Sequence, residues 1–244
     1  LLRERGVLIL EPASGRLTGT DSGPGRLPDP EQIVAAAQDV LRRGSALADL
    51  VGRHVVVSAG GTHEAWDPVR FLGNRSSGLQ GVELARTAVS RGARVTLVAA
   101  HLQVPAPAGV RLVTVDSAED LRLAMAQAVS ADLPVDAVVM AAAVADFRPA
   151  AVGEHKLKRE SAGAEVVLPL AQNADVLAGL VAARGDARAP VIVGFAAETG
   201  SADASVLDLG RAKLARKGCD LLVVNDVSDG RVFGRRDNEA VILG

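Results

Sequence analysis

The stretch HVVVSAGGTHEAWDPVRFLGNRSSGLQGVELARTAVSRGARVTLVAA, residues 54–100, decides the fold. It opens with a β-branched run at 54–58, passes through a long polar loop, continues with a helical pattern at 78–91 and closes with a second β-branched run at 94–100. Strands that are apolar on both faces and joined through helices are typical of a covered parallel sheet. The stretch therefore predicts two parallel strands connected by a helix.

The same alternation continues further along the chain. It predicts strands at 111–115, 136–143, 190–196 and 220–225, and helices at 117–130, 174–184 and 202–217. This pattern predicts an α/β fold, a Rossmann-like three-layer sandwich with a mostly parallel central sheet. Ligands of such folds bind at the carboxyl ends of the strands.

Before this region the sequence changes character. Residues 6–32 hold one short apolar run followed by many Gly, Pro, Ser and Asp residues, which predicts a strand end and then a loop or linker. Apolar residues then recur at helical spacing within 31–44, and Gly44 is a suitable stop signal for that helix. The last residues, EAVILG, read as a strand.

Composition excludes several classes of protein. The chain has 244 residues and is 48% hydrophobic, enough for a full core. It contains no apolar run near the roughly 18 residues of a membrane span and no signal-like leader, so we expect a cytoplasmic protein. A net charge of -2 and 2% aromatic residues do not suit a nucleic-acid binder. The four histidines lack zinc-like spacing, and the single cysteine, Cys219, precedes an apolar run and is expected to be a buried structural thiol.

Two glycine-containing loops could hold phosphates. Gly60 and Gly61 follow the first strand, where they serve either a ligand or a tight turn, and the residues alone leave both possibilities open. The stretch 73–80, GNRSSGLQ, has the glycine spacing of a P-loop but carries Leu and Gln where that motif needs Lys and Ser or Thr. Its serines, Ser76 and Ser77, are either helix N-caps or anion ligands. Positive charge for a phosphate must therefore come from elsewhere.

Acidic and basic residues follow the later strands. Asp146 comes after the fourth strand, where it either holds a magnesium ion or a hydroxyl group or merely forms a turn, whereas Asp175 opens a helix as a cap or a ribose ligand. Of 27 basic residues only four are lysines, in two pairs: Lys156 with Lys158, and Lys213 with Lys217. These pairs are either solvated surface patches or point charges for phosphates.

The motifs SAGGTHEAWDPVRFLGNRSSG, AAAVADFRP, KLKR, NADVL, GFAAET and KLARKGCDLLVVND, in this order, resemble those of the phosphopantothenoylcysteine synthetase family. The resemblance covers about residue 50 to the end. The first residues look like the closing segment of the flavin-dependent decarboxylase that is fused upstream in many bacteria. The resemblance therefore implies a decarboxylase tail and linker at 1–45 and a synthetase domain at 46–244.

The resemblance implies a ligase of coenzyme A biosynthesis. CTP activates the carboxylate of 4'-phosphopantothenate as an acyl-cytidylate with release of pyrophosphate, and L-cysteine then displaces CMP. Lys156 and Asn74 are the implied catalytic residues, and Asn74 acts on the acyl-cytidylate. The other implied features are Mg²⁺ held at Asp146, a homodimer, and no flavin in this half.

The resemblance also implies the ligand contacts. The nucleotide-binding residues are Met140, Ala141, Ala142, Asp146, Lys156, Ala174, Asp175, Val176, Leu177, Phe195, Lys213 and Lys217. The phosphate loop comprises Gly60, Gly61, Ser76, Ser77 and Gly78. The chain departs from the family in three places: Leu79-Gln80 replaces Lys-Met, Arg159 ends the KLKR motif, and Ala174 replaces the usual Pro.

Two other functions fit the same fold. An NAD(P)-dependent oxidoreductase would need an acidic residue after the second strand, where the chain reads AAHL at 99–102, and a GxGxxG turn, which is absent. The chain also has no tyrosine for a Tyr/Lys hydride-transfer site. A noncatalytic nucleotide-binding module would bind CTP but release no pyrophosphate, which distinguishes it from the ligase.

Overall fold

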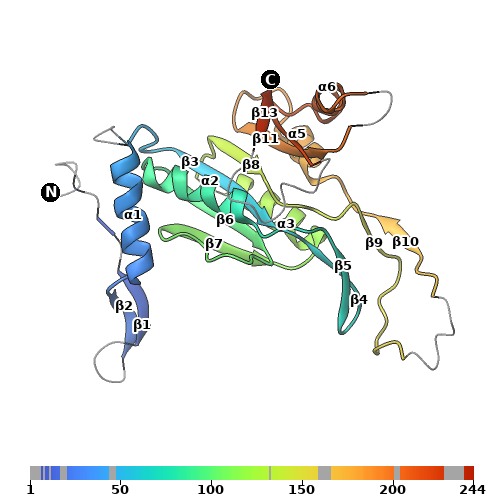
Figure 1. The fold of residues 1–244 in the computed structure, drawn as a ribbon, viewed down its shortest axis with the longest axis horizontal. Helices are drawn as coiled ribbons and strands as arrows, with labels where there is room; N and C mark the ends of the chain where they lie inside the picture. The colour runs from blue at the N-terminus through green and yellow to red at the C-terminus, as the bar shows by residue number, and fades with distance from the viewer. Residues whose placement is uncertain are drawn as a thin grey trace.

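The computed structural model describes residues 7, 9–10, 12–16, 21–43, 48–131, 133–158, 166–200, 204–227 and 239–244. Its centre is a seven-stranded sheet in the order β13-β12-β11-β8-β3-β6-β7 (Figure 1). The strands are β3 (His54–Gly60), β6 (Arg94–Ala100), β7 (Val110–Val115), β8 (Ala137–Met140), β11 (Val191–Glu198), β12 (Leu221–Asp226) and β13 (Ala240–Leu243). All neighbours pair in parallel except β12 and β13. The predicted mostly parallel sheet is confirmed.

Helices cover both faces of this sheet. On one face, Val82 and Ala85 of α2 (Leu79–Ser90) pack with Val57 of β3. The other face carries α3 (Ala118–Ser130), α5 (Val176–Arg184) and α6 (Val206–Lys217), whose apolar side chains form a second core cluster with Val56 of β3. Leu121 of α3 is fully buried there, and truncating such a residue to Ala costs about 2–5 kcal/mol. The three-layer prediction is therefore confirmed.

Two antiparallel ribbons extend beyond the sheet on the side of its carboxyl ends (Figure 1). One is the hairpin β4 (His63–Asp67) and β5 (Arg70–Gly73), and the other pairs β9 (Phe147–Pro149) with β10 (Leu170–Gln172). β9 packs against β4. The hairpin lies where the sequence predicted a loop, because its alternating small and polar residues give no clear strand pattern.

The N-terminal segment forms a separate set of elements on the opposite side of the sheet (Figure 1). It contains the hairpin β1 (Ala13–Arg16) and β2 (Ser22–Arg26), which lies within the predicted linker, and the predicted helix, α1 (Pro30–Arg43). The chain then joins the sheet region where Arg91 pairs with Asp49 and the N–H of Leu50 donates to the Arg91 carbonyl. No helix in the described part of the chain has both the length and the apolar content of a membrane span.

Several predicted boundaries were wrong for local reasons. β8 ends at Met140 rather than at 143, because the N–H of Ala142 donates to the Ser58 hydroxyl at 3.1 Å instead of to a neighbouring strand. α5 begins after Asp175 and α6 after Ser205, since each of these residues caps the helix that follows it. Part of the predicted start of α6, residues 202–203, lies outside the described residues.

Candidate active site

The glycine turn after β3 is bonded to the rest of the protein. Gly60 has φ 86°, and a Cβ there would lie 1.7 Å from the Ala100 carbonyl oxygen. The N–H of Gly61 donates to Ala100, and the N–H of Thr62 donates to Ala143. Both N–H groups are thus engaged in tying the end of β3 to its two neighbours. This supports the tight-turn reading, and phosphate binding by the turn stays a prediction.

The start of α2 differs from the serine-capped helix that the sequence allowed. Its N-cap is Gly78, in the left-handed conformation with φ 78°, and no side chain caps the helix. The Ser76 hydroxyl accepts the N–H of Gly78 at 3.3 Å, and the Ser77 hydroxyl accepts the N–H of Leu79 at 3.4 Å. A Cβ at Gly78 would lie 2.3 Å from Leu102. The glycine is therefore needed for close packing at this edge of the sheet.

Gln80 connects α2 to a distant strand. Its Oε1 accepts a hydrogen bond of 3.3 Å from Nδ2 of Asn225, at the end of β12. Asn225 is buried, and its Oδ1 has no partner among the described residues. Since β11 and β8 lie between β12 and β3 in the sheet, this bond passes over their carboxyl ends. Neither residue's role was predicted from the sequence, because nothing in the chain marks them as a pair.

Hydrogen bonds join four loops into one wall. Asn74 Nδ2 donates to the Val144 carbonyl at 3.1 Å, and the N–H of Ala145 donates to the Thr62 hydroxyl at 2.9 Å. Asn173 Nδ2 in turn donates to the Ala145 carbonyl at 2.9 Å. The loops after β3, β5, β8 and β10 are therefore held together, although 99 positions separate the two asparagines in the sequence, 173 − 74.

Two carboxylates lie along this wall. The backbone carbonyl of Asp146 accepts the N–H of Asn173, while its exposed carboxylate makes no hydrogen bond or ion pair with any described residue. Asp175 caps α5 by accepting the N–H of Ala178 at 3.0 Å, and its other oxygen pairs with Lys217. Burial opposes the ionisation of Asp175, but these two donors outweigh it and lower its pKa. Asp175 is therefore confirmed as a cap.

The two lysines of α6 are held by carboxylates. Lys213 Nζ lies 2.9 Å from Glu198 Oε1 at the end of β11, and Lys217 pairs with Asp175. Both side chains are mostly covered, with 27% of Lys213 and 20% of Lys217 exposed. A solvated surface patch would leave such side chains free, so the solvated-patch reading is wrong for this pair. Fixed ammonium groups at strand ends can instead bind anionic groups.

The residues expected to contact a nucleotide base lie at the ends of β8 and β11. Met140 is buried, and Ala142 is half-buried with its N–H bonded to Ser58. Phe195 is half-buried on the neighbouring strand. Val176 is buried, and half-buried Leu177 has its Cδ2 2.7 Å from where a Gly194 Cβ would stand, so the Leu177 side chain packs against β11. In the chain, Ala141 lies between Met140 and Ala142, and Ala174 lies just before Asp175 and Val176.

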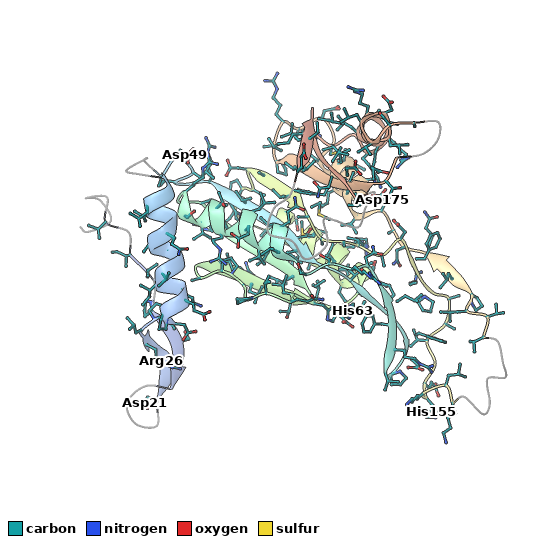
Figure 2. All side chains as sticks on the ribbon, in the orientation of Figure 1. Asp21, Arg26, Asp49, His63, His155 and Asp175 are labelled. Carbon is teal, nitrogen blue, oxygen red and sulfur yellow. The ribbon has the colours of Figure 1, made fainter. Side chains whose placement is uncertain are left out.

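Lys156 is not brought to this wall. Figure 2 shows its neighbour His155 at the outer end of the β4–β5 hairpin, away from Asp175 beside α5. The Lys156 side chain is exposed and pairs with no described residue. Arg159 of the same motif lies outside the described residues. Within one copy of the chain, the structure therefore separates Lys156 from the other predicted site residues.

Asp67 and Arg70 fix the Lys156 segment at the hairpin. Asp67 Oδ2 accepts the N–H of Leu157 at 3.2 Å and the Arg70 guanidinium at 2.9 Å, and Arg70 Nη2 also donates to the Leu157 carbonyl at 2.9 Å. The Arg70 hydrogen bond, opposed by burial, holds the pKa of Asp67 far below its usual range. Sequence reasoning missed this pair, since Asp-Pro-Val-Arg reads only as a turn.

Three side chains that the sequence did not associate gather at the ends of β3, β6 and β7. The rings of His63 and His101 stack with centroids 3.5 Å apart, and His101 Nε2 lies 2.5 Å from Asp116 Oδ1. Burial, and secondarily the nearby His101, lower the pKa of His63. The expectation that the histidines form no zinc site relied on their spacing along the chain, whereas the fold brings two of them together with Asp116; the expectation itself stays a prediction. Cys219 is buried as predicted, and burial raises its pKa.

Comparison with known proteins places this arrangement in context. The family described as the DNA/pantothenate metabolism flavoprotein C-terminal domain matches residues 50–244. The coenzyme A biosynthesis bifunctional protein CoaBC of Mycobacterium bovis is 55% identical, over 99% of this chain and 58% of the relative. The protein of the same name from Bacillus subtilis is 39% identical, over 100% of this chain and 57% of the relative. The chain thus spans a little under three fifths of the length of the curated relatives it matches.

Solved structures agree with the fold. A crystal structure of the C-terminal domain of a CoaBC protein is 33% identical, with a TM-score of 0.60, covering 82% of this chain and 89% of that one. The DNA/pantothenate metabolism flavoprotein of Streptococcus pneumoniae is 19% identical with a TM-score of 0.61, covering 78% of this chain and 92% of that one, which supports the fold alone.

Proposed function

The chain belongs to the family of the DNA/pantothenate metabolism flavoprotein C-terminal domain, and from this premise we propose that it is a ligase that joins 4'-phosphopantothenate to L-cysteine at the expense of CTP in coenzyme A biosynthesis. The observation that carries the proposal is the wall of loops, which gathers Asn74, Asp146, Asp175 and the lysines of α6 at the carboxyl ends of the central strands. This is where parallel α/β sheets bind ligands.

CTP is the proposed co-substrate. Its base is expected against the backbone at Met140 to Ala142 and the ring of Phe195, its ribose near Asp175, and its phosphates near Lys213 and Lys217. The ion pairs of both lysines support this role, because they hold the ammonium groups in place before a triphosphate arrives. The carboxylates of Glu198 and Asp175 compete with the phosphates for these ammonium groups.

Mg²⁺ is the proposed metal, and Asp146 suits it. Mg²⁺ typically takes one or two carboxylates together with phosphate oxygens of the substrate, and the Asp146 carboxylate is exposed and unpaired among the described residues. When bound, the ion would neutralise charge on the triphosphate. The N–H of Asn173 donates to the backbone carbonyl of Asp146 and so fixes the main chain from which the carboxylate extends.

The positive charge missing from the phosphate loop is assigned to Lys156. When the carboxylate of 4'-phosphopantothenate attacks the α-phosphate of CTP, charge accumulates on the phosphoryl oxygens, and a fixed ammonium stabilises the transition state more than the bound substrate. Lys156 has no competing carboxylate among the described residues, unlike Lys213 and Lys217. Because its neighbour His155 lies near the outer end of the β4–β5 hairpin, away from Asp175, we infer that Lys156 acts on the site of another copy.

We propose a homodimer in which each copy extends an arm, namely the β4–β5 hairpin with the attached segment that carries Lys156, to the site of the other copy. The β4–β5 and β9–β10 ribbons expose large apolar side chains: Val69 (60% exposed), Phe71 (53%), Phe147 (52%) and Val152 (58%). Exposed apolar surface on projecting ribbons is typical of an interface, and a two-fold dimer uses the same surface on both copies. Each site would then combine Asn74 of one copy with Lys156 of the other.

Asn74 is proposed to act in the second step, when the cysteine amine displaces CMP. Its amide already donates to the Val144 carbonyl, which fixes the side chain beside the wall. An amide has a second N–H and an acceptor oxygen to offer the acyl-cytidylate. A carboxylate at this position would instead repel the Val144 carbonyl and the phosphate.

The domain division is proposed as predicted, with a decarboxylase tail and linker at 1–45 and the synthetase at 46–244. The relatives carry the name of a bifunctional protein and are longer than this chain, which supports a covalently fused flavin-dependent decarboxylase upstream. No flavin is needed in the synthetase half.

Pyrophosphate release tests the proposed function. With CTP and 4'-phosphopantothenate the chain should release pyrophosphate, and adding L-cysteine should sustain turnover. A noncatalytic module would bind CTP and release nothing, and an oxidoreductase would change the absorbance of NAD(P)H instead.

A further inference from the structure

The cluster of His63, His101 and Asp116 is not used by the proposed reaction. The three residues follow β3, β6 and β7, which are adjacent in the sheet. The N–H of His63 donates to the Asp116 carbonyl at 3.0 Å, and His101 takes a left-handed conformation with φ 46°. The backbone therefore brings the three side chains to one place. Figure 2 shows His63 at the base of the hairpin.

We propose that His63, His101 and Asp116 bind a transition-metal dication of the zinc class. One ligand atom from each side chain can be chosen so that all three lie within 4.8 Å of one another. Two imidazole nitrogens and one carboxylate oxygen are typical ligands of Zn²⁺, Co²⁺ and Ni²⁺, whereas Mg²⁺ and Ca²⁺ prefer oxygen alone. This site would therefore select a different metal from the one proposed at Asp146.

Two of the three ligands are already close together. His101 Nε2 and Asp116 Oδ1 lie 2.5 Å apart, as a hydrogen-bonded pair. In a tetrahedral zinc site with bonds of about 2.0–2.2 Å, two ligand atoms lie about 3.3 Å apart. The pair would open by less than about 1 Å, and the metal would take the place of the shared proton. Both side chains are exposed, so the metal can enter from solvent.

The third ligand must turn. The rings of His63 and His101 are stacked at 3.5 Å with 13° between their planes, so one ion cannot lie in the planes of both rings, where the nitrogen lone pairs point. His63 would rotate out of the stack to bring a nitrogen toward the pair. Phe71 stacks on the other face of His63 at 3.5 Å, and this contact would also be lost. Metal binding therefore predicts a change in the environment of the Phe71 ring.

The test titrates the intact chain with Zn²⁺ alone and Co²⁺ alone, without nucleotide or substrate, so that its outcome is independent of the proposed ligase activity. One ion should bind per chain, and Co²⁺ should broaden the ring resonances of His63 and His101 and shift those of Phe71. His63→Phe keeps an aromatic ring in the stack, and His101→Asn suits the left-handed backbone. Each should weaken binding by at least about 10- to 100-fold, the range found even for residues that only support a metal ligand.

His155→Phe is the matched control, because His155 is an exposed histidine outside the cluster, and it should leave this binding unchanged. Far-ultraviolet circular dichroism establishes that each variant is folded. Stoichiometric Zn²⁺ binding that survives both His63→Phe and His101→Asn, or the absence of any saturable binding by the wild-type chain, would overturn the proposal.

Discussion

The carboxylate of Asp67 accepts the backbone N–H of Leu157, ninety positions further along the chain, at 3.2 Å. Arg70 completes the link by donating to both Asp67 and the Leu157 carbonyl. Through this contact the hairpin turn holds the segment that carries Lys156. The position of the proposed catalytic lysine therefore depends on an ion pair between the buried Asp67 and the partly exposed Arg70, apart from the proposed nucleotide site.

Replacing Asp67 tests this link through pH. Because the pKa of Asp67 is lowered in the folded state, its ionised form stabilises the fold above about pH 4, the ordinary value for Asp, and this contribution is lost as pH falls toward the lowered value. Asp67→Asn should therefore reduce the free energy of unfolding at pH 7, and its deficit relative to wild type should shrink below pH 4. Urea unfolding of both proteins at pH 7 and at a pH below 4 measures these free energies.

Asp186→Asn, at an exposed turn, provides the control and should show no such deficit. If Asp67→Asn were as stable as wild type at pH 7, or its deficit were the same at pH 7 and below pH 4, the Asp67–Arg70 ion pair would not hold the Lys156 segment.

Asn74→Asp should separate the two steps of the reaction. The first step should still release pyrophosphate, because Asn74 is assigned to the second. The acyl-cytidylate should then accumulate, since a carboxylate cannot donate to it. Mass spectrometry of the quenched reaction detects the intermediate. Turnover at the wild-type rate, or a failure to release any pyrophosphate, would contradict the assignment of Asn74 to the second step.

Lys156→Gln should nearly abolish the first step while CTP still binds. Losing one donor to a charged transition state typically costs about 10²- to 10³-fold in rate, or roughly 2.7–4 kcal/mol. Lys156→Arg should recover little, since a planar guanidinium does not replace a compact ammonium. Single-turnover pyrophosphate release measures the step, with the exposed Arg188→Gln as a control for lost surface charge. If Lys156→Gln slowed pyrophosphate release by only a few fold, Lys156 would be a solvated surface residue without a role in the first step.

Mixing two inactive variants tests whether the arm is exchanged. In a heterodimer of Lys156→Gln and Asn74→Asp chains, one site combines the intact Asn74 of one copy with the intact Lys156 of the other. Random pairing makes half of the dimers mixed, each with one working site of two, so about a quarter of wild-type activity should return. If both residues acted within one copy, no mixture would recover activity.

Lys213→Met should weaken CTP binding by roughly tenfold to a hundredfold, as expected for a hydrogen bond to a charged group. It removes an ammonium and leaves the Glu198 carboxylate without its partner near the proposed phosphate position. Arg211→Met, on the same helix, removes a cation that pairs with Asp208 and is 64% exposed, and it should leave the affinity unchanged. Isothermal titration with CTP and Mg²⁺ compares the affinities of the two variants. Equal affinities would show that Lys213 does not bind the nucleotide.

Much of the fold could be predicted from the sequence, because each central strand is a β-branched run and each helix repeats its apolar residues with the helical period. The β4–β5 and β9–β10 ribbons could not be predicted in this way. Residues 63–73 alternate irregularly and gain their pairing from the hydrogen bonds of one hairpin, and the end of β8 depends on the Ser58 hydroxyl, which is distant in sequence.

The site was predicted less completely, for a related reason. Asp175 could be recognised as a cap from its place before a helix, since capping is local. Contacts such as Asn74 with Val144, Lys213 with Glu198, and His63 with His101 join loops that only the sheet order brings together. The location of Lys156 is of the same kind, because it lies in the segment between β9 and β10 that Asp67 and Arg70 hold to the hairpin. This location is the reason for proposing a site built from two copies of the chain.

Pyrophosphate release is the measurement that tests the central claim most directly. Purified chain, Mg²⁺ and 4'-phosphopantothenate should release pyrophosphate with CTP, much less with ATP, and none in excess chelator, and L-cysteine should convert the intermediate to 4'-phosphopantothenoylcysteine with one CMP for each pyrophosphate. CTP binding without pyrophosphate release in the presence of both substrates, or equal release with ATP, would contradict the account.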